Sequence, residues 1–323
     1  LFIPETWNNI AVNELKSDIW VNEYITPCNI YSHGITNIFT YKKTQYQEMY
    51  IVETGAYGKA LVLDGKWQSC TGDEFLYHEP MVHPAMVAHG NPKKLLILGG
   101  GEGATLREVL RWTTVERAVM IDIDGDVVEA CREHLPEMHQ NAFDDPRTEL
   151  IIGDALEFVD TTSELWDVIL YDLSDPIEEG PSFQLFTQEL FQKVKRILAP
   201  DGYLAVQSGP VSPAELHLHA RLSSTLKSVF GSVQSYSSYV PTYAAPWSFI
   251  LAAATPMAIS DPDAIDRLLQ ANTKGDLQMF DGITLVGMMH LPANLRRAIA
   301  NETQVYTLTE PPKFFGKGVA TIN

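Results

Sequence analysis

Residues 95–103 are Leu95-Leu96-Ile97-Leu98-Gly99-Gly100-Gly101-Glu102-Gly103, an apolar run that ends in a glycine-rich loop containing one acidic residue. Residues 104–110 then favour a helix. A buried strand, a glycine loop and a helix start form the turn by which an α/β fold brings its backbone close to a ligand. The helix N-terminus attracts anions such as pyrophosphate, but Glu102 would repel one. We therefore expect a nucleoside ligand with a neutral or cationic group near this loop.

Acidic side chains follow four successive predicted strands at the points where the strands end. They are Glu102, Asp122, Asp154 and the pair Asp172 and Asp175. Asp122 lies about 20 residues after the loop, where an acid commonly holds a ribose hydroxyl pair. Each acid alone could instead cap a helix or stay solvated. Because parallel strands share one ligand-binding edge, we expect the five to line one crevice.

The remaining pattern alternates strands and helices, which predicts the α/β class with a Rossmann-like, methyltransferase-type, doubly wound sheet that is mainly parallel. Further strands are expected at residues 120–124, 150–152, 168–171, 203–206 and 247–254, the last being the terminal one. Helices are expected at residues 126–134, 186–198 and 213–230, the last with Ser212 as N-cap and Pro213 in its first turn.

The N-terminal part of the chain has a different pattern. Strand-like runs such as residues 49–52 and 60–63 are separated by glycine-containing turns, among them Asp64-Gly65. Asp-Gly between apolar runs is a strong hairpin signal. We expect a small β-strand domain over residues 1–76 and a Rossmann-like catalytic domain over residues 77–323, joined through a helix at 73–88.

Composition narrows the classes of partner. The 323 residues carry a net charge of −18, which argues against nucleic acid and anionic membranes as partners and suits small cationic substrates, although acidity can also serve solubility. No apolar run approaches the roughly 20 residues of a membrane helix, and residues 1–5 lack a signal sequence. The cysteines, Cys28, Cys70 and Cys131, form no metal or redox motif. A cytoplasmic protein with reduced thiols is expected.

Several motifs spread over nearly the whole chain occur together. They are Gln45-Tyr46-Gln47-Glu48, Leu63-Asp64-Gly65, Asp73-Glu74-Phe75-Leu76-Tyr77-His78-Glu79, the loop with Glu102, Asp144-Asp145-Pro146-Arg147, and Asp172-Leu173-Ser174-Asp175-Pro176 with Gly180-Pro181. Jointly they resemble the polyamine aminopropyltransferases, which include spermidine synthase and thermospermine synthase. The resemblance implies transfer of an aminopropyl group from decarboxylated S-adenosylmethionine to a polyamine nitrogen, with release of methylthioadenosine. It implies no cofactor beyond that co-substrate, and a homodimer or homotetramer formed through the N-terminal domain.

The resemblance also implies roles for individual residues. The nucleoside of the donor would be held by Gln47, Asp122, Asp154, Ala155 and Pro181, and the acceptor by His78, Asp175, Gln207 and Tyr243. Glu102 supports the donor assignment independently, because ordinary S-adenosylmethionine carries an α-carboxylate, whereas the decarboxylated form ends in an ammonium alone. A charge-assisted pair contributes on the order of 1.5 to 3 kcal/mol. Asp122 is shorter than the glutamate that many spermidine synthases have at the ribose position.

The reaction requires a proton acceptor, because an amine with a pKa of about 10 is protonated at neutral pH. Asp172, at a strand end beside the crevice, is the candidate general base, although it could instead cap the following turn. Tyr77 is the candidate for orienting the attacking nitrogen, although an aromatic residue there could instead belong to the core. Acids along the crevice would stabilise the moving positive charge without a metal. His217 and His219, two residues apart, face different sides of a helix, and no metal site is predicted.

The sequence motifs do not distinguish a diamine acceptor from a triamine acceptor. The expanded segment 175–181 and residues 240–247 are similar to thermospermine synthases, whereas Tyr243 and Ser174-Asp175-Pro176 match spermidine synthases. Putrescine is expected as the commoner acceptor, with spermidine as the alternative. Two other classes stay open: an S-adenosylmethionine-dependent methyltransferase, against which Glu102 argues, and a noncatalytic polyamine sensor, which would not explain the donor site.

Overall fold

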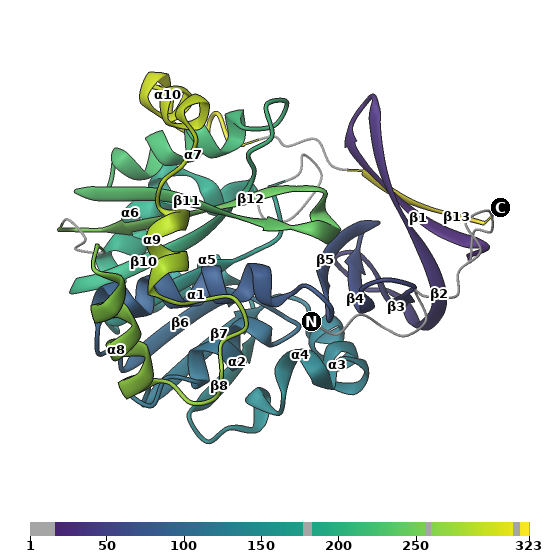
Figure 1. Cartoon of the computed structure of the whole chain (residues 1–323), viewed down its shortest axis with the longest axis horizontal. Coiled ribbons are helices and arrows are strands. Elements are labelled where there is room, and N and C mark those ends of the chain that lie inside the picture. The colour runs from purple at the N-terminus through teal and green to yellow at the C-terminus, as the bar shows by residue number, and fades with distance from the viewer. Residues whose placement is uncertain (1–16, 177–182, 256–259, 313–316, 323) are drawn as a thin grey trace.

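The computed structural model describes residues 17–176, 183–255, 260–312 and 317–322, and contains two sheets (Figure 1). The first is six-stranded and antiparallel, with the order β13-β1-β2-β3-β4-β5. Its strands are β1 (Ile19–Thr26), β2 (Asn29–Lys43), β3 (Glu48–Thr54), β4 (Gly58–Leu63), β5 (Lys66–Cys70) and β13 (Lys317–Ile322).

The hairpin predicted at Asp64-Gly65 is confirmed. These two residues join β4 to β5, and Leu63 pairs with Lys66. Both have positive φ, 49° for Asp64 and 73° for Gly65, which is the type I′ geometry that Asp-Gly favours. The turn therefore presents Lys66, the first residue of β5, next to the other sheet.

The second sheet is seven-stranded, with the order β11-β12-β10-β9-β6-β7-β8. Its strands are β6 (Lys94–Gly99), β7 (Arg117–Asp122), β8 (Thr148–Ile152), β9 (Trp166–Asp172), β10 (Leu198–Pro210), β11 (Ser232–Val240) and β12 (Ala245–Ala253). β10, β9, β6, β7 and β8 are parallel, whereas β12 is antiparallel to β10 and to β11. The expected mainly parallel sheet is confirmed.

The prediction that residues 247–254 form the terminal strand is wrong in two respects. The strand expected at 247–254 corresponds to β12, which lies inside the sheet, because the unpredicted β11 takes the edge. β12 is also not the last strand: β13 follows it and pairs with β1, from Ile19↔Ile322 to Tyr24↔Lys317. The first sheet therefore takes one strand from the 77–323 range.

Helices cover both faces of the seven-stranded sheet, as Figure 1 shows. They are α1 (Phe75–His89), α2 (Ala104–Leu110), α3 (Gly125–His134), α4 (Pro136–His139), α5 (Ala155–Thr161), α6 (Gln188–Ile197), α7 (His217–Lys227), α8 (Pro262–Asn272), α9 (Gly282–Met288) and α10 (Ala293–Asn301). Alternate strand residues face opposite sides: Leu95 and Ile97 join the core under α1, whereas Leu96 and Leu98 join the core under α6 and α7. This double burial explains the continuous apolar run.

One helix prediction needs correction at its start. The helix expected at 213–230 is α7, which begins at His217, so Ser212 is not its N-cap and Pro213 is not in its first turn. The Ser212 hydroxyl instead donates to Glu215 Oε2 at 2.6 Å, and the backbone N–H groups of Glu215 and Leu216 bond to the Ser212 carbonyl. A separate turn therefore precedes the helix.

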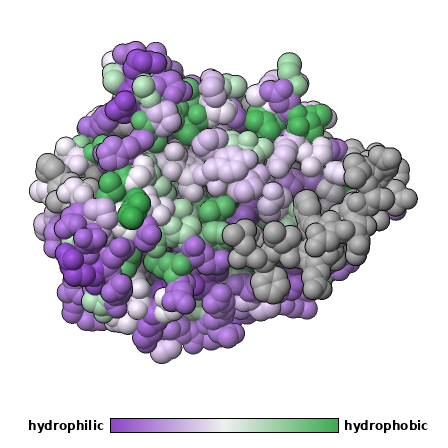
Figure 2. Space-filling view, viewed as in Figure 1, coloured by the Kyte–Doolittle hydropathy of each residue, from purple (hydrophilic) through white to green (hydrophobic). Residues whose placement is uncertain are grey.

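The surface agrees with the composition. Hydrophilic side chains gather at the top and along the lower edge of the face in Figure 2, in line with a chain in which 20% of the residues are charged. Within the described ranges, no helix has the length and apolarity that crossing a bilayer requires.

Candidate active site

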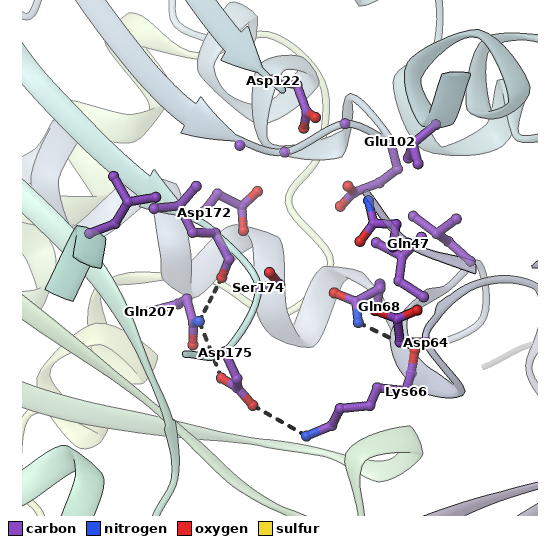
Figure 3. Close-up of a pocket in the computed structure, with 18 of the residues that line it drawn as sticks. Gln47, Asp64, Lys66, Gln68, Glu102, Asp122, Asp172, Ser174, Asp175 and Gln207 are labelled. Atoms are coloured by element: carbon purple, nitrogen blue, oxygen red, sulfur yellow. Dashed lines mark hydrogen bonds and ion pairs between the residues drawn. The ribbon is translucent and has the colours of Figure 1, made fainter. Parts of the chain in front are cut away.

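A cavity of about 400 Å³ lies between the carboxyl ends of the parallel strands and the hairpin of β4 and β5 (Figure 3). It is lined by all five acids that follow the predicted strands: Glu102, Asp122, Asp154, Asp172 and Asp175. Parallel topology is the reason, because it brings the ends of β6, β7, β8 and β9 to one edge.

The glycine loop lets the backbone approach this edge. Gly99 has a φ of +84°, and a Cβ there would overlap the carbonyl oxygen of Asp172 on the neighbouring strand. A Cβ at Gly101 would lie 2.9 Å from Asp122 Oδ2. Larger residues would therefore push the loop away from two of the acids that line the cavity.

Asp172, the last residue of β9, is held by two hydroxyl groups. The Tyr77 hydroxyl donates to Oδ1 at 2.7 Å, and the Thr105 hydroxyl donates to Oδ2 at 2.6 Å. Burial and the nearby Glu102 raise the pKa of Asp172, whereas His78 and the two hydroxyl donors oppose the rise. No sequence motif marks Thr105 as a site residue, because it lies 67 residues from Asp172 along the chain.

His78 was predicted to help hold the acceptor, but it does not line the cavity. Its side chain is fully buried behind Glu102. Its Nε2 bonds Glu102 Oε1 at 2.8 Å, and its Nδ1 bonds Glu74 Oε2 at 2.7 Å. Burial alone would lower the pKa of His78, but hydrogen bonds to Glu102 and Glu74 outweigh it and raise this pKa to about 10. The imidazolium thus fixes the Glu102 carboxylate in place.

His78, Glu102 and Asp172 also bring one potential metal-ligand atom each to within 4.8 Å of one another. Both ring nitrogens of His78 already bond carboxylates, and an imidazolium has no lone pair to offer a metal. The cluster is therefore better suited to balancing charge than to holding an ion.

The residues predicted to hold the nucleoside include Gln47, Asp122, Asp154 and Ala155, which line the cavity at its Asp122 end. Burial raises the pKa of Asp122 to about 6, and its Oδ1 accepts the Asp124 N–H at 2.9 Å. Asp154 also caps α5 by accepting the Leu156 N–H. Gln47 donates to Asp124 Oδ2 at 3.1 Å. Pro181 lies outside the described residues.

At the other end, the predicted residues Asp175, Gln207 and Tyr243 line the cavity. Gln207 Nε2 donates to the Leu173 carbonyl at 2.6 Å and to Asp175 Oδ1 at 3.3 Å, which orients the carboxylate (Figure 3). The Tyr243 hydroxyl donates to the Gln68 carbonyl, so this hydroxyl is already engaged within the protein.

Three charged residues that the sequence analysis did not single out complete this end. Glu23 comes from β1, Lys66 from β5 and Glu215 from the turn before α7, and all line the cavity. Their positions 23, 66 and 215 carry no shared motif. Only the packing of the two sheets brings them together.

Two family models match the chain in sequence. The spermine/spermidine synthase domain matches residues 74–261, and the spermidine synthase tetramerisation domain matches residues 19–70. A polyamine aminopropyltransferase of Synechococcus sp. strain JA-2-3B'a(2-13) is 56% identical over 306 residues, covering 92% of this chain and 98% of that protein. The chain belongs to the polyamine aminopropyltransferase family.

Other members of the polyamine aminopropyltransferase family support the same conclusion. The protein of this name from Aeropyrum pernix is 42% identical, covering 90% of this chain and 93% of its own. A spermidine synthase in complex with the transition-state analogue AdoDATO aligns with a TM-score of 0.80 at 29% identity, over 88% of this chain and 95% of that one. The spermidine synthase of Thermotoga maritima also aligns with a TM-score of 0.80, at 26% identity, over 93% of this chain and 100% of that one. The expected fold and enzyme class are confirmed, and the chain is an aminopropyltransferase.

Proposed function

We propose that this aminopropyltransferase transfers the aminopropyl group of decarboxylated S-adenosylmethionine to putrescine, giving spermidine and methylthioadenosine. The observation that carries this proposal is Asp172. Its half-buried carboxylate lies between the Asp122 and Glu102 end of one cavity and the Asp175 end (Figure 3). A base between the two ends can accept a proton from an amine that attacks a donor bound at the first end.

In the proposed donor site, Gln47, Asp122, Asp154, Ala155 and Pro181 hold methylthioadenosine. The Glu102 carboxylate, steadied by the His78 imidazolium at 2.8 Å, binds the aminopropyl ammonium. His78 acts here as a positioning residue, since it is fully buried and absent from the cavity wall. The other end, with Asp175, Gln207 and Tyr243, holds the acceptor.

In the proposed step, a protonated primary amine of the acceptor gives one proton to Asp172 and becomes a neutral amine. Its nitrogen lone pair attacks the aminopropyl carbon bonded to sulfur, a carbon–nitrogen bond forms, and the carbon–sulfur electron pair returns to sulfur. The sulfonium becomes the neutral thioether of methylthioadenosine. Tyr77, 2.7 Å from Asp172 Oδ1, orients the base and the nitrogen. The surrounding carboxylates stabilise the positive charge as it moves.

Glu102→Gln tests the donor site. Because the variant loses the charge that attracts the ammonium and repels a carboxylate, we expect the preference for decarboxylated over ordinary S-adenosylmethionine to fall at least about tenfold. Calorimetric titration with both nucleosides measures the ratio. Glu116→Gln, which removes one charge from a surface ion pair with Lys93, is the matched control and should leave the ratio of the two affinities unchanged. An unaltered ratio in Glu102→Gln would remove the residue from donor selection.

We propose that the protein is cytoplasmic and forms a homodimer or homotetramer through its N-terminal sheet. We place the boundary between its two domains at residues 76 and 77. The match of residues 19–70 to a tetramerisation domain supports the oligomer. β13 would then contribute to the N-terminal unit, because it pairs with β1.

Product analysis by mass spectrometry tests the reaction. The purified chain is incubated with decarboxylated S-adenosylmethionine and, separately, with putrescine, spermidine and agmatine. Methylthioadenosine and spermidine from putrescine are expected. A tetraamine formed preferentially from spermidine would move the assignment to thermospermine or spermine synthesis, and no methylthioadenosine with any amine would refute the proposed reaction.

A further inference from the structure

Lys66 is the single cationic side chain among the described residues that line the cavity. Its ammonium lies 3.6 Å from Glu23 Oε1 and 3.7 Å from Asp175 Oδ2. All three side chains are nearly closed to solvent, with 12%, 11% and 7% of their surface exposed. Lys66 thus joins the N-terminal sheet to the acceptor end of the cavity.

Lys66 lies on the far side of Asp172 from the donor end. In Figure 3, Asp122 and Glu102 lie on one side of Asp172, and Asp175 with Lys66 on the other. An acceptor whose reacting nitrogen is at Asp172 therefore extends toward Lys66. The ammonium is a fixed positive charge along that direction.

The local charge balance defines what this end can accept. Three carboxylates, those of Glu23, Asp175 and Glu215, line it together with one ammonium. Burial raises the pKa of Glu23 and of Asp175, and Lys66 opposes the rise in both. Buried carboxylates require a counter-ion, and Lys66 supplies one from within the chain.

Acceptors differ in how many cations they bring to this end. A diamine that reacts through one nitrogen retains one ammonium, whereas a triamine retains two charged nitrogens on a longer chain. The position between Glu23 and Asp175 already holds the Lys66 ammonium. We infer that Lys66 selects acceptors by excluding a third nitrogen, so that its charge favours diamines over triamines. Repulsion of like charges is an efficient way to reject a near relative of the preferred ligand.

This inference rests on the proposed reaction, and the experiment separates the two. Values of kcat/KM are measured with putrescine, with spermidine, and with cadaverine, a longer diamine without a third nitrogen. Lys66→Met removes the charge and keeps most of the side-chain length. We expect the ratio of kcat/KM for spermidine to that for putrescine to rise at least about tenfold, while the cadaverine ratio changes much less.

Three further variants keep the result interpretable. Lys66→Arg retains the charge and should retain the wild-type ratio. Lys66→Gln removes the charge but keeps a donor between the two carboxylates, and serves if Lys66→Met does not fold; binding of methylthioadenosine reports folding. Lys93→Met removes an exposed lysine paired with Glu116 and should change nothing. An unchanged or lower spermidine ratio in a folded charge-removing variant overturns the inference, as does a wild-type preference for spermidine. An inactive wild type with every amine would instead refute the proposed reaction.

Discussion

Asp172 illustrates how a few residues set up this site. Its carboxylate accepts bonds from Tyr77 on α1 and Thr105 on α2, and its backbone carbonyl accepts the Gly100 N–H at 3.0 Å. Three segments therefore fix the residue that we propose as the proton acceptor. Because burial and Glu102 raise its pKa, it is a stronger base than an exposed aspartate.

Asp172→Asn should reduce kcat at least about 10²-fold, the lower range for loss of a general base, because asparagine cannot accept the proton of the amine. Affinity for methylthioadenosine should be mostly retained. Steady-state kinetics and calorimetry measure the two quantities. Asp167→Asn is a control on the same strand at its opposite end, where Asp167 accepts the N–H groups of Lys93 and Lys94; it should alter stability rather than turnover. Near-normal kcat in folded Asp172→Asn would exclude the base role.

His78 couples the same site to stability. Its pKa is raised from 6.5 to about 10 in the folded state, so the native protein holds a proton that the unfolded chain releases. This contribution to the free energy of unfolding is complete below pH 6.5 and is lost as the pH rises through about 10. We expect the difference in urea midpoint between wild type and His78→Gln to be largest near pH 6.5 and to narrow towards pH 10. A constant His78→Gln difference across this pH range would contradict the imidazolium.

At the scale of elements, α1 carries Tyr77 and His78 despite two internal prolines, Pro80 and Pro84. Pro84 has no N–H, so the Pro80 carbonyl lacks its helical partner. The buried hydroxyl of Tyr236 on β11 donates to that carbonyl at 2.9 Å. The unpredicted strand β11 thus replaces one hydrogen bond that the prolines remove from the helix that supports the site.

Tyr236→Phe should lower the free energy of unfolding by about 1–3 kcal/mol, because it leaves a buried carbonyl without a donor. In a Pro84→Ala background the backbone N–H of residue 84 can donate to the Pro80 carbonyl. Tyr236→Phe should then lower the free energy of unfolding by about 1 kcal/mol less than it does in the wild type. Chemical unfolding of the four proteins gives the double-mutant cycle. Equal costs in both backgrounds would show that the hydroxyl does not replace the missing helical bond.

At the scale of the whole molecule, the two ends of the described chain meet in one sheet. β13 pairs with β1 over six residue pairs, and Figure 1 shows the two strands side by side. β1 also supplies Glu23 to the Asp175 end of the cavity. The C-terminal strand therefore supports a strand that forms part of the site wall.

Removal of residues 317–323 should expose one edge of β1 and leave the seven-stranded sheet intact. We expect faster amide hydrogen exchange in residues 19–24, with self-association through the open edge, while affinity for methylthioadenosine is retained. Exchange mass spectrometry and light scattering measure these effects, with β6 as the internal reference. Unchanged exchange in β1 would show that β13 does not stabilise it.

The sequence by itself determined the parallel sheet, the glycine loop, the Asp64-Gly65 turn and the edge at which five acids meet, because each depends on local periodicity, turn chemistry or the topology of parallel strands. The start of α7, the strand β11 and the pairing of β13 with β1 came only from the tertiary structure. So did the bond from Thr105 to Asp172, the burial of His78 behind Glu102, and the meeting of Lys66 with Glu23 and Asp175. These are contacts between residues far apart in the chain, and their geometry depends on how two sheets and their helices pack.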